Sequence, residues 1–492
     1  MRLRPKPKQE GPFWGRLAQR KKIPLFVDYV SNAMTLAPAG SGKGICSVIP
    51  NILSITHSKV IADFKGELIC VLKAALEARG EKVLFLNPGA LWKSILGEGD
   101  QYCPIDLIVD SFYIAGGLRD VPDDLREMAA QISPEPEEQG ENFYFREGAR
   151  DCIQISMVIE AMVEGYDATL SSVALLIEDR QSLEDNLRWV VGVDLDGKKL
   201  PGGPMPIEQA DWAHLHEPQD VAEFAKLIRA RAANLLKLMT TQGSNTFDSF
   251  IKGAQQALAP FAFGRLAPSM GRSTFSMNDL KGHDGPVSLF IVSDASRPEV
   301  YKTFNGLIQW CALTTLKRHE NKSRPVYFMM DEATNYKING LESLLTWGRS
   351  YGIRLHLIFQ DLSAFERVYG KEALETLLSE TEIKQFLPGQ RSPKTLELIE
   401  KMLGNQSVMM ASLSGQGAER GLHEHLSESA RPLMFADEIR RTAHGILFVR
   451  KLPAFLIEPI DYAEVVPWRT QAGINPFHGK PFLKKVKLKL KA

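Results

Sequence analysis

A glycine-rich segment near the N-terminus carries the residues best suited to bind a phosphate. The segment Ala37-Pro38-Ala39-Gly40-Ser41-Gly42-Lys43-Gly44 follows a short apolar run and precedes a stretch compatible with a helix. Closely spaced glycines let backbone N–H groups surround phosphate oxygens, and a helix start and a lysine add positive charge. The pattern is typical of a Walker A loop, although Ala37 replaces its first glycine and Gly44 replaces its magnesium-binding serine or threonine. A glycine-rich turn with a surface lysine is the alternative for this segment taken alone.

Two adjacent acids end another apolar run. Asp331 and Glu332 directly follow the run from Val326 to Met330. In nucleotide hydrolases an aspartate at this place holds Mg²⁺, directly or through water, and the following glutamate can polarise the attacking water. Gln360 ends a further apolar run and is a candidate to orient water or sense the γ-phosphate. The alternative is that the two acids are an ordinary solvated strand end. This alternative is weaker because the same chain also contains a phosphate loop.

The elements that must position these residues are short apolar runs alternating with helical stretches. Such alternation predicts a parallel α/β sheet, and runs bounded by Gly, Pro, Asp or Asn predict its buried strands. The predicted strands are Ala33–Ala37, Lys59–Asp63, Lys82–Leu86, Val287–Val292, Val326–Met330, Arg354–Phe359, Ile383–Leu387 and Gly445–Val449.

The hydrophobic pattern of the sequence changes between about residues 105 and 275. Strand-like runs vanish there and helical periodicity dominates, so we expect an inserted all-α region. Further on, the polar segment Gly404–Ala430 predicts a long loop. The lysine-rich end, residues 484–491, predicts a basic tail that frays by default or pairs as an edge strand.

Composition excludes several classes of protein. The 492 residues are 44% hydrophobic and 24% charged, which argues against wholesale disorder and against an integral membrane bundle. Lysine plus arginine and aspartate plus glutamate number 59 each, so net charge identifies no partner. Five scattered cysteines predict buried free thiols in a reducing compartment, without disulfides or structural zinc.

The sequence as written also lacks a secretory signal and an apolar stretch long enough to span a membrane, which predicts a cytosolic chain. Its first 22 residues carry eight basic residues and one acid, Glu10. A segment of this kind either binds anionic lipids or is a solvated tail.

Taken together, several motifs in family order resemble the coupling proteins of type IV secretion and conjugation, the TraG/TraD-like ATPases, which are related to ring-shaped DNA translocases. The motifs are residues 37–44 running into Val48–Leu53, Asp63-Phe-Lys-Gly-Glu67, Asp331-Glu332, Gly348–Arg354 leading into Gln360–Ser363, and Tyr369-Gly-Lys-Glu372, with weaker similarity at Arg431–Met434 and Asp461-Tyr462. They extend over roughly residues 30 to 465.

The resemblance implies a RecA-like P-loop NTPase whose parallel sheet is interrupted by an inserted all-α domain. The expected parts are a basic N-terminal segment (1–30), the nucleotide-binding domain (31–105 and 276–470), the inserted domain (106–275) and a basic C-terminal tail (471–492).

It also implies ATP and Mg²⁺ as ligands, bound between the subunits of a homohexamer. The expected nucleotide contacts are Gly40, Ser41, Gly42, Lys43, Gly44 and Asp63; the expected catalytic residues are Lys43, Glu332, Gln360 and Arg349. Asp331 would hold Mg²⁺, with Ser41 as the candidate hydroxyl given Gly44. Arg349 would be an arginine finger acting on a neighbouring subunit, with Arg354 as the neighbouring alternative. A structural role in an ion pair is the alternative for Asp63.

The function that the resemblance implies is ATP-driven coupling of DNA–protein or protein substrates to a type IV secretion channel. Partners would be the channel, relaxosome or effector proteins and DNA, at the cytoplasmic face of the inner membrane. Family members usually begin with a transmembrane region, which this sequence lacks, so a removed anchor, a partner or the basic N-terminus would provide the membrane contact. Two alternatives stay open: a ring-shaped DNA translocase or helicase unrelated to secretion, and a catalytically silent docking receptor.

Overall fold

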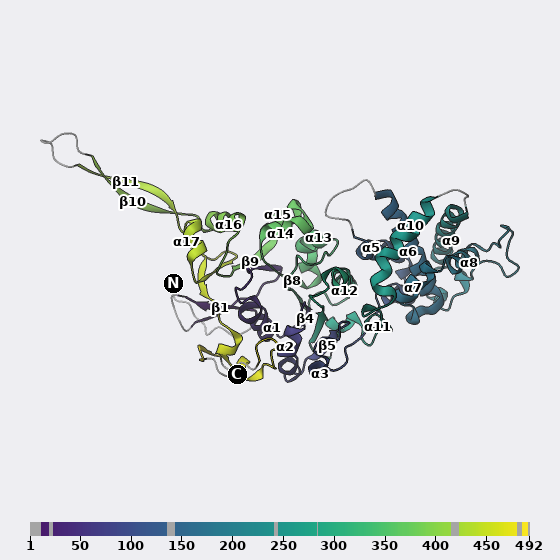
Figure 1. Cartoon of the computed structure of the whole chain (residues 1–492), viewed down its shortest axis with the longest axis horizontal. Helices are drawn as coiled ribbons and strands as arrows, with labels where there is room; N and C mark the ends of the chain where they lie inside the picture. The colour runs from purple at the N-terminus through teal and green to yellow at the C-terminus, as the bar shows by residue number, and fades with distance from the viewer. Residues whose placement is uncertain are drawn as a thin grey trace. The chain divides into compact units, whose positions relative to one another are not determined.

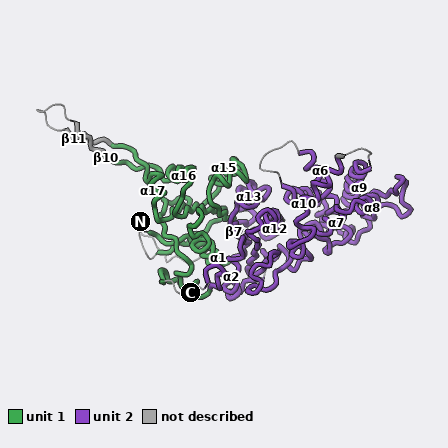
Figure 2. The backbone as a smooth tube through the Cα atoms, in the orientation of Figure 1, with its two compact units in different colours: residues 1–56, 355–471, 481–492 green, residues 57–354, 472–480 purple. Residues whose placement is uncertain are grey.

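The chain forms two compact units in a computed structural model that describes residues 11–18, 23–134, 143–240, 245–282, 284–414, 423–479 and 485–490 (Figures 1 and 2). Unit 1 comprises residues 1–56, 355–471 and 481–492, and unit 2 comprises residues 57–354 and 472–480.

Unit 1 is built on a mixed sheet. Its strands follow the order β2 (Pro24–Phe26), β1 (Phe13–Leu17), β13 (Phe455–Glu458), β12 (Gly445–Val449), β9 (Thr381–Phe386), β3 (Asn32–Leu36) and β8 (Ile353–Phe359), the last five residues of β8 belonging to this unit. β3 runs parallel to β8 and β9, with Leu36 opposite Phe359 and Phe386. Every residue of β3 is buried, as the apolar run predicts for a central strand.

Helices and two small strand pairs complete unit 1. The segment after β3 forms a π-helical turn, η1 (Gly44–Val48), that continues into α1 (Ile49–Ser54). The other helices are α14 (Leu362–Tyr369), α15 (Lys371–Glu380), α16 (Pro393–Leu403), α17 (Ala436–Arg441) and α18 (Trp468–Gln471). The small strand pairs are β10 (Asn405–Ser414) with β11 (His423–Pro432) and β14 (Val465–Val466) with β15 (Leu488–Lys489).

Unit 2 contains a parallel sheet with the strand order β7 (Val326–Met330), β4 (Ser58–Asp63), β6 (Val287–Val292) and β5 (Lys82–Leu86). β4, β6 and β7 are buried along their whole lengths. α2 (Glu67–Glu77) packs on β4 and β5, and α12 (Pro298–Arg318) packs against α5 of the helical region. The short helices α3 (Lys93–Leu96) and α13 (Leu341–Trp347) and the 3₁₀ turn η7 (Gly348–Tyr351) lie in the connections.

Among the described residues between 106 and 275, the regular elements are helices, and the β structure there is an isolated bridge between Val193 and Lys199. α10 packs against α6 and α7, and α8 packs against α9. The helices are α4 (Asp106–Tyr113), α5 (Val121–Ile132), α6 (Phe143–Glu164), α7 (Leu170–Glu178), α8 (Arg180–Val191), α9 (Pro218–Thr240), α10 (Asn245–Ala262) and α11 (Leu266–Ser269). The domain boundaries given above stay a prediction. No helix in the described ranges combines the length and hydrophobicity that crossing a membrane requires.

All eight predicted strands are present, with ends shifted by no more than two residues. The expected direction is wrong for Gly445–Val449, because β12 is antiparallel to both β9 and β13. The predicted loop Gly404–Ala430 is also wrong in its described part, where β10 and β11 form a ten-residue antiparallel ladder. These strands were not predicted because they form a separate two-stranded sheet and lack the continuous apolar run of a buried strand.

The described parts of the two chain ends are packed in the fold, which departs from a solvated tail at the N-terminus and selects the strand alternative at the C-terminus. Phe13 and Trp14, within the expected basic segment, are fully buried in β1. Leu488, within the expected fraying tail, is buried in β15, so this part pairs as a strand. The other predicted basic positions at the N-terminus, except Arg16, lie outside the described residues. The five cysteines are free thiols, and four of them are buried as predicted, whereas Cys46 is partly exposed.

Candidate functional site

The phosphate loop begins where β3 ends. Gly40 and Gly42 have φ angles of +80° and +77°, which residues with a Cβ rarely adopt. A Cβ on Gly42 would also lie 3.3 Å from the Cys46 Sγ atom. The Ser41 amide donates to the Pro38 carbonyl at 3.1 Å, which closes the turn. These two glycines are therefore required by the backbone, as the motif predicts.

The two departures from the motif do not distort the loop. Ala37 is 2% exposed, and its amide donates to the Phe359 carbonyl at 3.0 Å, so it continues the pairing of β3 with β8. Gly44 lies outside the left-handed region, and a Cβ there would meet no atom within 4 Å. Neither departure therefore disturbs the backbone of the loop.

Ser41 provides an independent indication that the loop is built for a ligand. Its Oγ atom is buried and has no hydrogen-bond partner among the described residues. A buried hydroxyl without a partner is costly, because it has given up its bonds to water. A phosphate oxygen or a hydrated Mg²⁺ would satisfy it, so the residues of the loop fit a Mg–nucleotide.

Gln360 lies at the same edge of the unit 1 sheet as the phosphate loop. β3 and β8 are parallel neighbours, so the residues that follow them, Ala37 and Gln360, leave the sheet side by side. The Gln360 side chain is exposed. Unit 1 therefore brings together the phosphate loop and the predicted glutamine.

In unit 2, two predicted acids follow neighbouring parallel strands. Asp63 ends β4 and Asp331 follows β7. Burial is the main cause that raises the Asp63 pKa to about 7, and the negative charges of Asp331 and Glu67 raise it further, against hydrogen bonds from two backbone amides. These bonds come from Lys65 N at 3.3 Å and Ile69 N at 2.9 Å, so Asp63 also caps the first turn of α2.

Glu332 has an unusual backbone. Its φ angle is +49°, in the left-handed region that a non-glycine residue rarely occupies. Its amide donates to the Asp331 Oδ1 atom at 3.0 Å and its carbonyl accepts from Asn335 N at 2.8 Å. The tight turn after β7 therefore holds the glutamate in a strained conformation, as is frequent where function requires a fixed direction.

The two candidate arginine fingers differ in their surroundings. Arg354 donates to the Tyr327 hydroxyl, and its guanidinium lies 5.0 Å from the centre of that ring. Arg349, in η7, is exposed and its side chain contacts no hydrogen-bond or ion-pair partner among the described residues. Arg349 is thus available to another molecule, whereas Arg354 is engaged within unit 2.

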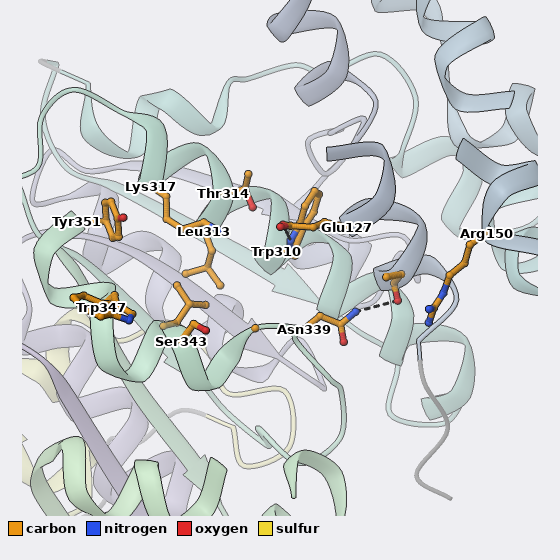
Figure 3. Close-up of a pocket in the computed structure, with 13 residues that line it drawn as sticks. Glu127, Arg150, Trp310, Leu313, Thr314, Lys317, Asn339, Ser343, Trp347 and Tyr351 are labelled. Carbon is orange, nitrogen blue, oxygen red and sulfur yellow. Dashed lines mark hydrogen bonds between the residues drawn. The ribbon is translucent and has the colours of Figure 1, made fainter. Parts of the chain in front are cut away.

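A cavity of about 480 Å³ in unit 2 contains none of the predicted site residues (Figure 3). It lies between α5, α12, α13 and η7, with Trp310, Trp347 and Tyr351 in its wall. The Trp310 indole donates to the Glu127 carboxylate at 3.3 Å, and Asn339 Nδ2 donates to the Ala130 carbonyl at 3.0 Å. Residues of the helical region line one side of the cavity, and residues of α13 line another. α13 lies between Glu332 and Arg349 in the sequence.

The predicted site residues thus fall into two groups. Unit 1 carries Gly40, Ser41, Gly42, Lys43, Gly44 and Gln360, and unit 2 carries Asp63, Asp331, Glu332 and Arg349. Within the described ranges, no cluster of three or more His, Cys, Asp or Glu side chains has the arrangement of a metal site. The sequence analysis missed a buried polar group next to the phosphate loop, which includes Ser47 and Gln385. The sequence carries only a weak signal for this group, because Gln385 lies in β9, where four of the six residues are polar.

Comparisons with known proteins agree on one family. A family model described as Type IV secretory system Conjugative DNA transfer matches residues 4–462. The conjugal transfer protein TraG of Escherichia coli is 24% identical over 437 residues, which cover 83% of this chain and 61% of TraG. Protein VirD4 of Agrobacterium fabrum is 23% identical over 465 residues, which cover 92% of this chain and 62% of VirD4. The chain thus spans about three fifths of the length of these relatives.

Solved structures give the same fold. The bacterial conjugative coupling protein TrwBdeltaN70 matches with a TM-score of 0.58 at 17% identity, covering 91% of this chain and 88% of TrwB. TrwB in complex with ADP and Mg²⁺ matches with a TM-score of 0.56 at 17% identity, covering 88% of this chain and 86% of TrwB. The likeness confirms the predicted fold class, a RecA-like P-loop fold with an all-α domain.

Proposed function

Because the chain belongs to the type IV secretory system conjugative DNA transfer family, we propose that it is an ATP-driven coupling protein of a secretion or conjugation system. It would recruit DNA–protein or protein substrates and deliver them to the secretion channel. The observation that carries this proposal is the phosphate loop, with its two left-handed glycines and the unpartnered, buried hydroxyl of Ser41.

Nucleotide binding is supported by TrwB, which was solved in complex with ADP and Mg²⁺ and with a non-hydrolysable ATP analogue. In this chain, backbone amides of residues 40–44 would surround the phosphates, and Lys43 would neutralise the β- and γ-phosphate oxygens. Asp63 would belong to the nucleotide surroundings. Mg²⁺, when bound, would neutralise phosphate charge, with Asp331 and Ser41 as its candidate ligands.

Hydrolysis requires a water molecule in line with the γ-phosphate. Glu332 would accept a proton from this water, and Gln360 would orient it by hydrogen bonding. Arg349 of a neighbouring copy would stabilise the negative charge that develops in the transition state. This role requires a homo-oligomer, and a homohexamer is the form that we propose.

The proposed partners are the secretion channel, the relaxosome or effector proteins, and DNA. The proposed place of action is the cytoplasmic face of the inner membrane, reached through a partner or an anchor. A DNA translocase without a channel and a silent docking receptor would share the fold, so activity has to separate them.

Substitution of the loop lysine tests the proposal. We expect Lys43→Ala to abolish ATP hydrolysis by the purified chain and substrate transfer from donor cells, with the free energy of unfolding unchanged. Lys198→Ala is the matched control, because Lys198 is 77% exposed in a surface loop of unit 2 and carries the same charge. Normal transfer by the Lys43 variant would reject the motor. Transfer by a wild-type chain that shows no measurable ATP hydrolysis would favour the docking receptor, whereas hydrolysis that disappears in Glu332→Gln would exclude it.

A further inference from the structure

Four buried polar side chains lie against the helix that leaves the phosphate loop. Thr35 is on β3, His356 on β8, Gln385 on β9 and Ser47 in η1. Their exposed fractions are 0% for three of them and 1% for Gln385. Thr35 lies directly opposite Gln385 in the parallel ladder of β3 and β9. The group therefore joins three adjacent strands to the helix start in the interior of unit 1.

The hydrogen bonds of this group have a fixed direction. Gln385 Nε2 donates to the Trp14 carbonyl at 3.3 Å, so its Oε1 atom faces the hydroxyl groups. That oxygen accepts from Thr35 Oγ1 at 2.9 Å and from Ser47 Oγ at 2.8 Å. The Thr35 hydroxyl has one hydrogen, which it gives to Gln385, so the His356 Nε2 atom at 2.8 Å must carry the hydrogen between them. Ser47 is thus held by a glutamine oxygen whose position two other groups determine.

The position of Ser47 matters because η1 is a π-helical turn. The Ile49 amide donates to the carbonyl of Gly44, five residues earlier, whereas the Cys46 amide reaches back only four residues to Gly42. A π-helical turn contains one residue more than an α-helical turn and is frequent at functional sites. Relaxation to an α-helix would rotate the preceding residues by about 100° around the axis. The loop amides and Lys43 would then point in other directions.

We propose that Ser47 and Gln385 are positioning residues that fix the π-helical turn and thereby aim the phosphate loop at the nucleotide. Ser47 touches neither phosphate nor metal in this proposal and acts through the backbone of residues 40–44. The inference rests on the proposed nucleotide-binding function of this loop. Thr35 donates to the same glutamine oxygen as Ser47 and is bonded in turn to His356, and neither Thr35 nor His356 has a side-chain bond to the turn among the described residues.

This arrangement supplies a matched pair of variants. Ser47→Ala and Thr35→Val each remove one fully buried hydroxyl that donates to Gln385 Oε1. Thr35→Val also removes the acceptor of His356 Nε2, so we expect it to lower the free energy of unfolding at least as much as Ser47→Ala does. Only Ser47→Ala removes the side-chain bond that holds the π-helical turn η1. The measurement is calorimetric titration of each full-length variant with Mg²⁺ and the ATP analogue AMPPNP, together with urea unfolding. We expect Ser47→Ala to weaken analogue binding about five- to tenfold and Thr35→Val less than about twofold.

Equal weakening in both variants, or none in either, would overturn the role of Ser47. Ser47→Cys is the second variant if Ser47→Ala does not fold, because a thiol has nearly the same shape and is a weak donor. An affinity between those of the wild type and Thr35→Val would then contradict the proposal, and a clearly weaker affinity would support it. Failure of the wild-type chain to bind the analogue would instead contradict the proposed function, so the two failures are distinguishable.

Discussion

At the scale of single residues, Glu332 combines a strained backbone with a predicted chemical role. Its φ angle of +49° costs a residue with a Cβ about 1–2 kcal/mol, which glycine avoids. We expect Glu332→Gly to raise the free energy of unfolding by about 1 kcal/mol and to abolish ATP hydrolysis. Urea unfolding and a phosphate-release assay measure the two effects.

Glu332→Gln is the control for this prediction. It keeps the strained backbone and the size of the side chain but removes the carboxylate that would accept the proton. We expect unchanged stability, retained nucleotide binding and no turnover. Hydrolysis at the wild-type rate in this variant would show that Glu332 is not the base.

His356 makes a second prediction at this scale. Burial lowers its pKa from 6.5 to about 3, so the ring stays neutral in the folded chain over the range in which it becomes charged in the unfolded chain. The unfolded state therefore binds the extra proton, and the contribution to stability is complete above pH 6.5 and is lost as the pH falls toward 3. From about pH 7 to about pH 5 the loss is about 2 kcal/mol.

The measurement is urea unfolding of the wild type and of His356→Gln at both pH values. The glutamine cannot titrate and can still donate to Thr35. We expect the variant to be less stable than the wild type at neutral pH but to lose about 2 kcal/mol less on acidification. An identical pH dependence in the two proteins would contradict the buried neutral ring.

At the scale of elements, the phosphate loop contains glycines of two kinds. Gly42 needs its left-handed backbone, whereas Gly44 has an ordinary helical φ and open space where a Cβ would lie. We expect Gly44→Ala to raise the free energy of unfolding by about 0.5–1 kcal/mol and to keep nucleotide binding. Gly42→Ala should lower stability by at least about 1 kcal/mol and abolish binding.

Thermal unfolding and analogue titration on the two variants provide the comparison. Each variant adds the same methyl group, two residues apart, so their difference isolates the backbone requirement. Loss of nucleotide binding in Gly44→Ala would contradict the prediction, because it would show that this position requires glycine itself.

The strands that could be predicted from the sequence are mainly the buried ones. β5, β6, β7 and β12 have the predicted bounds, because apolar residues dominate each of them, with Lys82 at the start of β5 and Ser288 within β6 as the polar exceptions. β1 and β13 were missed, because each is short and mixes apolar with polar residues, as strands of an antiparallel margin do. Such strands form because they pair with segments that are distant in the sequence, so a local sequence pattern does not predict them.

At the scale of the whole molecule, residue types at strand ends point to a candidate site, whereas the buried groups that support the phosphate loop carry no such signal. Asp63 and Asp331 follow parallel neighbours, so the rule that such ends share an edge brings them together. The bond between Ser47 and Gln385 joins residues 338 positions apart, and either residue alone has the pattern of an ordinary helix or strand position. Such contacts depend on the completed sheet, which is why the sequence did not reveal them.

The last prediction concerns oligomerisation, because the role that we propose for the exposed Arg349 requires a neighbouring copy of the chain. We expect Arg349→Ala to reduce turnover about 10³-fold or more, as for arginine fingers in other nucleotidases. Arg354→Ala should mainly lower stability, since Arg354 packs on Tyr327 within its own unit. In a head-to-tail ring, an Arg349→Ala copy still has an intact phosphate loop, and a Lys43→Ala copy still has its arginine.

Coexpression of the Arg349→Ala and Lys43→Ala chains should therefore restore activity that neither has alone. With random mixing in equal amounts, about a quarter of the contacts join an intact loop to an intact arginine, so turnover should approach about a quarter of the wild-type value. Lys43→Ala coexpressed with a chain carrying both substitutions supplies no such contact and should stay inactive. If the two single variants show no recovery in assemblies that contain both, Arg349 does not act on a neighbouring copy. If Arg349→Ala retains full turnover, it is not a finger at all, and the choice between Arg349 and Arg354 has to be made on the hydrolysis rate of folded Arg354→Ala.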